Sequence, residues 1–318
     1  MTSKPIAIYY EHPDWFRPLF AELDARGVEY VELNPSCHSF DPAAADQDFS
    51  LLFNRMSASA HLRGNGQAIF FTQSYLAYLE TLDVRVINGT RAFALEISKV
   101  RQLQLLYSLG LCFPKTQVVN CANEIPAAAL QIGFPLLVKP NIGGRGAGIV
   151  RLDSMDQLEA AINKASLNFG IDQTALVQEF IPARNGHITR VETLGGKFLY
   201  AIDIFTSGRS FNLCPAEICQ VESASAFLED STVGAPNPRL KVETSKPPPS
   251  IIDAVEKIAA FGGIDVGGVE YMVDDRDGRI VYYDINALSN FVANAPQVLG
   301  FDPHARLVDY LEQQKEHA

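Results

Sequence analysis

A glycine-rich loop between two short apolar runs is the first stretch of the sequence that could do chemistry. It occupies residues 139–148 and reads Lys-Pro-Asn-Ile-Gly-Gly-Arg-Gly-Ala-Gly. The flanking runs, 134–138 and 149–152, predict two strands that the loop joins as a hairpin. Glycines let backbone N–H groups approach an anion closely, and Lys139 and Arg145 add positive charge. The pattern indicates phosphate binding.

Two commoner glycine loops do not fit this stretch. A P-loop needs Lys-Ser or Lys-Thr after its last glycine, whereas Ile149 follows Gly148. A dinucleotide-binding fingerprint should lead into a helix, and this loop leads into another strand. An ordinary glycine-rich turn is the alternative that the loop by itself leaves open.

A second group of side chains offers oxygen ligands. Residues 266–273 and 279–285 predict a hairpin around a turn at 274–278, with Glu270 on one strand and Asp284 and Asn286 at the end of the other. Asp284 and Asn286 are two residues apart and share a face. Such donors suit Mg²⁺ held together with nucleotide phosphates. Solvent-facing acids are the alternative, although the apolar neighbours of Asp284 speak against it.

Composition limits the class of protein. The chain has 318 residues, 47% of them hydrophobic, so it can bury a large core in two or three subdomains. Its net charge of −11 argues against nucleic acid or a membrane surface as partner. Five cysteines without a C-x-x-C pair indicate reduced thiols, and no apolar run predicts a signal peptide or membrane span. We therefore expect a soluble, cytoplasmic protein.

The first 89 residues predict a β-α-β domain. Strands are expected at 6–10, 28–33, 50–53 and 84–87, and helices at 14–26 and 67–81. Arg55 follows the third strand, at the edge where open α/β sheets bind ligands. It could hold a substrate carboxylate or be an ordinary surface arginine.

The remaining chain mixes helices with antiparallel strands. One long helix is expected over 90–109, with Lys99 beside its apolar positions, and others at 154–165, 250–262 and 303–315. Strands are expected at 175–181, 188–194 and 197–205, the last two joined by Gly195-Gly196. Glu179 lies in an apolar strand and needs a partner, which a purine amino group could supply. Residues 206–249 predict a long irregular loop.

In order and spacing, these motifs resemble the ATP-grasp superfamily, and in particular its RimK-like carboxylate-amine (glutamate and peptide) ligases. They are Lys99, the glycine hairpin, Gln178-Glu179-Phe180-Ile181 and Glu270…Asp284-x-Asn286. The resemblance implies an α/β and α+β fold with a Rossmann-like pre-ATP-grasp domain over 1–89. The linking helix and small lobe would then cover 90–182, and the C-terminal lobe with the metal site 183–318.

The resemblance also implies roles for single residues. Lys99 and Lys139 would bind the ATP phosphates, under a flap with Gly143, Gly144, Arg145, Gly146 and Gly148, and Gln178, Glu179 and Ile181 would line the adenine pocket. Glu270, Asp284 and Asn286 would hold Mg²⁺. Arg190 and Asn212 match residues near the family's reaction centre, but Ile204 stands where the family has an arginine, so Arg209 is expected to take its place.

The implied activity is ATP-dependent ligation that releases ADP and phosphate. A carboxylate would attack ATP to give an acyl phosphate, and an amine, from an amino acid or peptide, would then form an amide bond. Two alternatives stay open: a nucleotide-binding regulatory protein that has lost turnover, and an ATP-grasp kinase that does not ligate. The sequence also leaves open the substrates and whether the chain forms a homo-oligomer.

Overall fold

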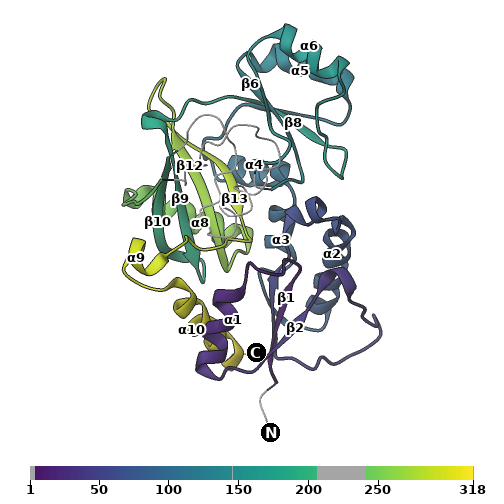
Figure 1. The fold of residues 1–318 in the computed structure, drawn as a ribbon, viewed down its shortest axis with the longest axis vertical. Coiled ribbons are helices and arrows are strands. Elements are labelled where there is room, and N and C mark those ends of the chain that lie inside the picture. Colours follow the sequence, from purple (N-terminus) through teal and green to yellow (C-terminus); the bar gives the residue numbers. More distant parts are fainter. Residues whose placement is uncertain (1–3, 145, 206–240, 318) are drawn as a thin grey trace, which may run out of the picture.

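Three β-sheets with surrounding helices make up the part of the chain that the computed structural model describes, residues 4–144, 146–205 and 241–317. Figure 1 shows the N-terminal sheet at the bottom, a small sheet at the top and a larger sheet beside both. No helix in these ranges is long and apolar enough to cross a membrane. The mixture of parallel and antiparallel sheets agrees with the predicted α/β and α+β class, whereas the predicted domain boundaries stay a prediction.

The N-terminal sheet is parallel and has the order β2-β1-β3-β4. Its strands are β1 (Ile6–Tyr10), β2 (Tyr30–Leu33), β3 (Leu51–Arg55) and β4 (Arg85–Ile87), and its helices are α1 (Arg17–Arg26) and α2 (Gly66–Thr81). The short 3₁₀ helices η1 (Pro35–Cys37) and η2 (Ala58–Arg63) lie in its loops. The central strands β1 and β3 are buried on both faces, as expected for a parallel sheet covered by helices.

The long helix expected over 90–109 is in fact two helices, so that prediction was wrong. They are α3 (Thr90–Glu96) and α4 (Lys99–Ser108). Ser98 has an extended backbone, and its hydroxyl accepts a hydrogen bond from Arg101 N at the start of α4. A serine in this position caps a new helix, because it satisfies an N–H that the first turn leaves free. Lys99 is therefore the first residue of α4.

The small sheet is antiparallel, has the order β5-β8-β6-β7 and confirms the predicted glycine hairpin. Its strands are β5 (Thr116–Val119), β6 (Leu136–Pro140), β7 (Val150–Leu152) and β8 (Ala175–Glu179). Helices α5 (Ile125–Ile132), after η3 (Ala122–Glu124), and α6 (Met155–Asn163) pack their apolar side chains against this sheet. The glycine loop joins β6 to β7.

The large sheet is also antiparallel, with the order β11-β10-β9-β12-β13. Its strands are β9 (His187–Leu194), β10 (Lys197–Phe205), β11 (Val242–Thr244), β12 (Val266–Val273) and β13 (Ile280–Asn286), and η4 (Arg184–Gly186) precedes them. Helix α8 (Pro249–Gly262) and α4 pack on one face. β11 lies in the stretch predicted as irregular, of which 206–240 is outside the described residues.

The last helices return to the N-terminal domain. They are α9 (Ala295–Leu299), which was not predicted, and α10 (Pro303–Glu316), which was. Leu307, Val308 and Leu311 of α10 share an apolar core with Leu19 and Leu23 of α1. Figure 1 shows α1 and α10 side by side. The first and last parts of the chain therefore lie against each other.

Buried amide side chains join segments that are distant in sequence. Gln102 of α4 donates to Ile285 O (2.8 Å) and accepts from Ile285 N (3.2 Å). Because β13 is an edge strand, these backbone groups have no strand partner on that side. Asn88 binds the backbone of Asp265, Val266 and Ala287 in the same way. Gln102 therefore fixes α4 against the large sheet, and Asn88 fixes the N-terminal domain against it.

Replacing Gln102 tests whether its hydrogen bonds to the Ile285 backbone stabilise the fold. Gln102→Leu keeps the volume but leaves the N–H and C=O of Ile285 without partners, and each unsatisfied buried group costs about 1–3 kcal/mol. We expect the free energy of unfolding to fall by at least about 2 kcal/mol in urea titrations. Gln104→Leu, exposed on the same helix, is the control and should change it by less than about 0.5 kcal/mol. An equal loss of unfolding free energy in the two variants would contradict this role of Gln102.

Candidate functional site

A cleft of about 300 Å³ lies between the small sheet and the large sheet. It brings together most of the residues that the sequence singled out: Lys99, Lys139, Gly143, Gly144, Gly146, Gln178, Glu179, Ile181, Arg190, Glu270, Asp284 and Asn286. Gly148 is not among the residues that line it. Arg145, Arg209 and Asn212 lie outside the described residues, so their predicted roles stay predictions.

Asn141 places the two lysines beside each other. It directly follows β6, which carries Lys139. Its side-chain oxygen accepts hydrogen bonds from Ser98 Oγ (3.1 Å) and Val100 N (3.0 Å), and its carbonyl accepts from Lys99 N (3.4 Å). The start of α4 is thereby held against the end of β6, so both lysine side chains reach the cleft.

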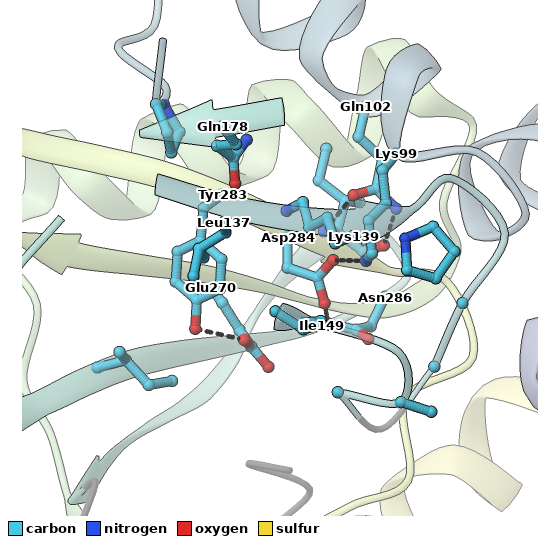
Figure 2. Close-up of a pocket in the computed structure, with 18 of the residues that line it drawn as sticks. Lys99, Gln102, Leu137, Lys139, Ile149, Gln178, Glu270, Tyr283, Asp284 and Asn286 are labelled. Atoms are coloured by element: carbon cyan, nitrogen blue, oxygen red, sulfur yellow. Dashed lines mark hydrogen bonds and ion pairs between the residues drawn. The ribbon is translucent and has the colours of Figure 1, made fainter. Parts of the chain in front are cut away.

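Lys99 is paired with a residue that was predicted to bind metal. Its Nζ lies 2.5 Å from Asp284 Oδ1, and Figure 2 shows the two groups facing each other. Burial opposes charge on Asp284, but Lys99 outweighs it, so the pKa of Asp284 lies below its ordinary value. Burial likewise opposes charge on Lys99, yet Asp284 keeps its pKa raised. Both groups are therefore charged.

In the part of the chain that the structure describes, Lys139 has no such direct partner, and the charges of Asp284 and Glu270 compensate it only in part. Its side chain is buried, and burial together with the nearby charge of Lys99 lowers its pKa to about 7. The described residues include no hydrogen-bond or ion-pair partner for its amine that would hold the proton. An anion entering the cleft would favour the charged form of this amine.

The register of the β12–β13 hairpin brings the oxygen donors together. Glu270 stands opposite Asp284, and Gly268 stands opposite Asn286. Burial and the charge of Asp284 raise the pKa of Glu270. Asn286 Nδ2 donates to Asp284 Oδ2 at 3.2 Å. Two acids that repel each other in a buried site are a place where added positive charge is stabilising.

A β-bulge adds a tyrosine to this group. Glu270 pairs with Asp284 and Tyr271 pairs with Tyr282, so Tyr283 is an extra residue on β13. Its hydroxyl donates to Glu270 Oε2 at 2.6 Å (Figure 2). The alternation of side chains along a regular strand would have pointed Tyr283 away from the cleft, and the bulge changes this direction.

The donor set suits a magnesium ion that nucleotide phosphates help to bind. In the described ranges, no group of three or more His, Cys, Asp or Glu side chains forms a complete metal site. Glu270, Asp284 and Asn286 supply two carboxylates and one amide, which are hard oxygen ligands. A metal held by few protein ligands and several phosphate oxygens requires no more than this.

Arg190 lies beneath the acids, in a network that the sequence did not reveal. It donates to Glu192 Oε1 (2.6 Å), Glu270 Oε1 (3.2 Å) and Ser289 Oγ (2.8 Å). Burial opposes its charge, but Glu192 and Glu270 keep its pKa raised. Gly268 leaves room for this network, since a Cβ there would lie 2.9 Å from Arg190 Nε and from both Glu192 oxygens.

The glycine loop closes the cleft against the N-terminal domain. A Cβ on Gly144 would lie 2.9 Å from Ser59 Cβ, so glycine is needed for this approach. Gly146 has a φ of 71°, in the left-handed region that favours glycine. Ser59 and Ser57 also line the cleft. The loop therefore packs on another domain at the mouth of the site, and its predicted role in phosphate binding stays a prediction.

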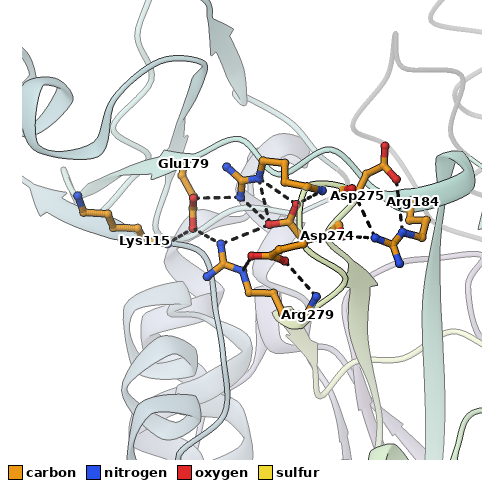
Figure 3. Close-up of polar contacts among 8 residues, drawn as sticks. Lys115, Glu179, Arg184, Asp274, Asp275 and Arg279 are labelled. Atoms are coloured by element: carbon orange, nitrogen blue, oxygen red, sulfur yellow. Dashed lines mark hydrogen bonds and ion pairs between the residues drawn. The ribbon is translucent and has the colours of Figure 1, made fainter.

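The carboxylate of Glu179 has protein partners. Its Oε1 accepts from Lys115 N (2.8 Å), and its Oε2 lies 3.3 Å from Arg276 Nη2. A purine amino group is thus not needed to satisfy it, and its place in an adenine pocket stays a prediction. Figure 3 shows this network continuing to Arg279 and Asp274 in the β12–β13 turn.

This network joins the small lobe to the large one. Asp274 accepts from Arg276 Nη2 at 2.6 Å, and hydrogen bonding to Arg276 lowers the pKa of Asp274 to about 2. Arg184 reaches the neighbouring Asp275 across the same turn (Figure 3). The spacing of charges in this turn was visible in the sequence, but its partners across the lobes were not.

Ile204 and Glu96 lie in environments that the sequence did not predict. Ile204 is fully buried in the apolar core that the large sheet shares with the N-terminal domain. Glu96, which was not singled out, lines the cleft and accepts from Leu288 N at 2.9 Å. Its position three residues before Lys99 was no usable signal, because α3 ends at Glu96 and α4 begins at Lys99.

Parts of this chain are similar in sequence to known ligases. Residues 111–212 match the family model described as D-ala D-ala ligase C-terminus. The D-alanine–D-alanine ligase of Aromatoleum aromaticum is 28% identical over 213 residues, which cover 62% of this chain and 63% of that protein. A probable alpha-L-glutamate ligase of Thioalkalivibrio sulfidiphilus is 27% identical, over 63% of this chain and 70% of that protein. The chain thus spans less than two thirds of the first relative.

Solved structures extend the likeness to nearly the whole chain. A RimK domain ATP-grasp protein from Sphaerobacter thermophilus has a TM-score of 0.64 and 21% identity, over 96% of this chain and 98% of that one. The ATP-grasp ligase PsnB, in complex with a phosphomimetic precursor variant, Mg and ADP, has a TM-score of 0.67 and 18% identity, over 99% and 100%. The predicted ATP-grasp fold and the predicted resemblance are confirmed.

The lowered pKa of Lys139 predicts that phosphate binding is linked to proton uptake. With a free-protein pKa of about 7, Lys139 is largely neutral at about pH 8, and bound ATP would restore its charge. Affinity should therefore fall as the pH rises above about 7. Calorimetry in two buffers of different ionisation enthalpy measures the uptake.

The variant Lys139→Ala should bind ATP more weakly and without this proton uptake. Lys164→Ala, exposed in the same lobe, is the matched control and should keep both. If Lys139→Ala takes up as many protons as the wild type, Lys139 is not the group that titrates.

Proposed function

We propose that this chain, which has the ATP-grasp fold, is an ATP-dependent carboxylate-amine ligase that forms an amide or peptide bond and releases ADP and phosphate. One observation carries the proposal. Lys99, Lys139 and Arg190 converge with Glu270 and Asp284 in one cleft, under a glycine loop. Buried cations beside oxygen ligands, without an evident nucleophile, suit the positioning and neutralisation of phosphate charge.

The reaction would proceed in two steps. A carboxylate oxygen attacks the γ-phosphorus of ATP and the bond to the β-phosphate oxygen breaks, giving an acyl phosphate and ADP. The amine nitrogen then attacks the carbonyl carbon, phosphate leaves, and the nitrogen loses a proton. Lys99 and Lys139 would hold the phosphates through both steps, because their charges are the ones that an incoming polyphosphate can engage.

Mg²⁺ is the metal that we propose for the acids. Glu270, Asp284 and Asn286 would hold it, and when bound it would neutralise charge on the transferred phosphate. In the protein alone Lys99 neutralises Asp284, so phosphate and metal together can replace this pair without leaving either charge unpaired. Such an exchange keeps the buried site balanced.

Exclusion of water is the task of the loop. An acyl phosphate is hydrolysed if water reaches it, so the site must close during the reaction. The glycine loop lies against Ser59 of the N-terminal domain, and this contact closes one side of the cleft. We propose an amino acid or peptide among the substrates, in keeping with the ligases named above. A cytoplasmic place of action stays a prediction.

The variant Asp284→Asn tests the metal role. It removes an anionic ligand and adds a donor where only acceptors are suited to a cation. We expect ADP formation to fall at least about a hundredfold, which corresponds to roughly 3 kcal/mol of lost transition-state stabilisation. ADP release is measured across a Mg²⁺ titration with a panel of carboxylates and amines, and folding is checked by circular dichroism.

The matched control is Asp277→Asn, in the exposed turn of the same hairpin, which should keep full activity. Folded Asp284→Asn that consumed ATP at the wild-type rate would sink the ligand assignment. A wild type that bound Mg-ATP but made no ADP with any substrate pair would instead favour the regulatory alternative. ADP formed with a carboxylate alone, with no amide product, would favour the kinase.

The flap predicts a separation of activity from stability. Gly146→Ala and Gly300→Ala both place a side chain at a left-handed φ, 71° and 80°, and should each lose about 1–2 kcal/mol of stability. Only Gly146 belongs to the loop over the cleft, so only Gly146→Ala should lower ADP formation strongly. Denaturant titrations and turnover assays measure the two effects. Full activity of Gly146→Ala would mean that the loop is merely a turn.

A further inference from the structure

Arg55, at the carboxyl end of β3, is buried rather than exposed. Its side chain is only 4% accessible, which excludes the ordinary surface arginine that the sequence left open. Its guanidinium lies over the rings of Phe16 and Phe53, at 5.2 and 5.0 Å from their centroids. One nitrogen, Nη2, donates to Ser289 O at 2.5 Å and is 3.4 Å from Asn290 Oδ1.

The charge of Arg55 is poorly compensated. Nη1 is buried and has no hydrogen-bond partner among the described residues. Glu96 and Glu192 influence it only from a distance, and no carboxylate of the described ranges forms an ion pair with it. Burying a cation without a counter-ion costs several kcal/mol of free energy. A bound anion beside Arg55 would recover part of this cost.

Arg55 lines a second cavity, of about 490 Å³. Its other walls come from the start of α1, residues 289–296 and the start of α10. Of the two acids of the wall, Asp14 pairs with Arg17, and Asp302 accepts a hydrogen bond from the backbone N–H of His304 at 2.9 Å. Arg55 is therefore the buried wall residue with an unused charged donor, whereas Arg17 is 75% exposed.

This second cavity adjoins the cleft. Trp15 and Asn290 line both. Ser289 lies between two arginines: its hydroxyl accepts from Arg190 Nη2 at 2.8 Å, and its carbonyl accepts from Arg55 Nη2 at 2.5 Å. A molecule anchored at Arg55 could thus extend past Asn290 toward the side of the cleft where Arg190 and Glu270 lie.

We propose that this second cavity binds the free carboxylate of the amine substrate, with Arg55 as its anchor. This inference rests on the proposed ligase function and adds a substrate class to it. The carboxylate that becomes an acyl phosphate must lie with the phosphates in the cleft, so a carboxylate held at Arg55 is one that does not react. The amine substrate is accordingly an amino acid or a peptide with a free C-terminus. The unpartnered Nη1 of the guanidinium would donate to this carboxylate, and the fixed charge of the arginine would neutralise it.

The test compares acids with their amides. Alanine, glutamate and alanyl-alanine, in both enantiomers, are offered as amine substrates beside the corresponding C-terminal amides. With wild type, we expect the productive acid to have a KM roughly ten- to a hundredfold lower than its amide, the range of one lost charged hydrogen-bond pair. Arg55→Met should raise the KM of the acid to that of the amide and leave the KM of ATP unchanged.

A second arm uses the same compounds without ATP. Acids that bind the cavity should raise the melting temperature of wild type, and neither their amides with wild type nor the acids with Arg55→Met should do so. Arg306→Met, an exposed arginine of α10 outside the cavity, is the control and should behave as wild type. Arg55→Lys keeps the charge without the guanidinium donors and should bind acids more weakly than wild type.

The two arms separate the inference from the proposed function. If no compound supports ADP formation but acids stabilise wild type through Arg55, the cavity is a carboxylate site and the ligase proposal fails. If ligation occurs and the acid and amide have equal KM, the inference is overturned and the ligase proposal stands. Absence of any stabilisation by the acids would also overturn the inference. The acid–amide comparison needs no variant, so it decides even if Arg55→Met does not fold.

Discussion

The ion pair between Lys99 and Asp284 is the contact on which the rest of the site depends. It spans from the first residue of α4 to the edge strand of the large sheet, and both groups are mostly withdrawn from water. Either charge alone in this position would be strongly unfavourable, whereas the pair is stable and can be exchanged for phosphate and a cation. The cleft is thus prepared for charged ligands before any has bound.

Buried amides hold the elements that carry these charges. Gln102 ties α4 to the edge of β13, Asn141 ties the start of α4 to the end of β6, and Asn88 ties the N-terminal domain to β12. Each satisfies backbone groups that no strand or helix could reach. These hydrogen bonds therefore fix the three sheets relative to one another, although no strand pairing of the described residues joins one sheet to the next.

Arg190 and Arg55, the two buried arginines that contact Ser289, differ in their charged partners. Arg190 is matched by Glu192 and Glu270, and Arg55 lacks a carboxylate partner within the described chain, yet both donate to Ser289. A compensated arginine supports the acids beneath the phosphates, and an uncompensated one attracts an anion. This difference follows from which strands face them and not from the residues that adjoin them in sequence.

Several features of the site follow from neighbouring residues alone. Short-range patterns specify the glycine hairpin, the lysine on its first strand and the Asp-x-Asn pair, because alternation and turn residues act over a few positions. Tertiary structure decided what depends on distant partners. Asn141 holds Ser98, and Ser98 caps α4, which divides the single long helix that the sequence predicted. A bulge in β13 turns Tyr283 into the cleft. Packing on Phe16 buries Arg55. No local pattern contains these contacts, since each joins segments that only the folded chain brings together.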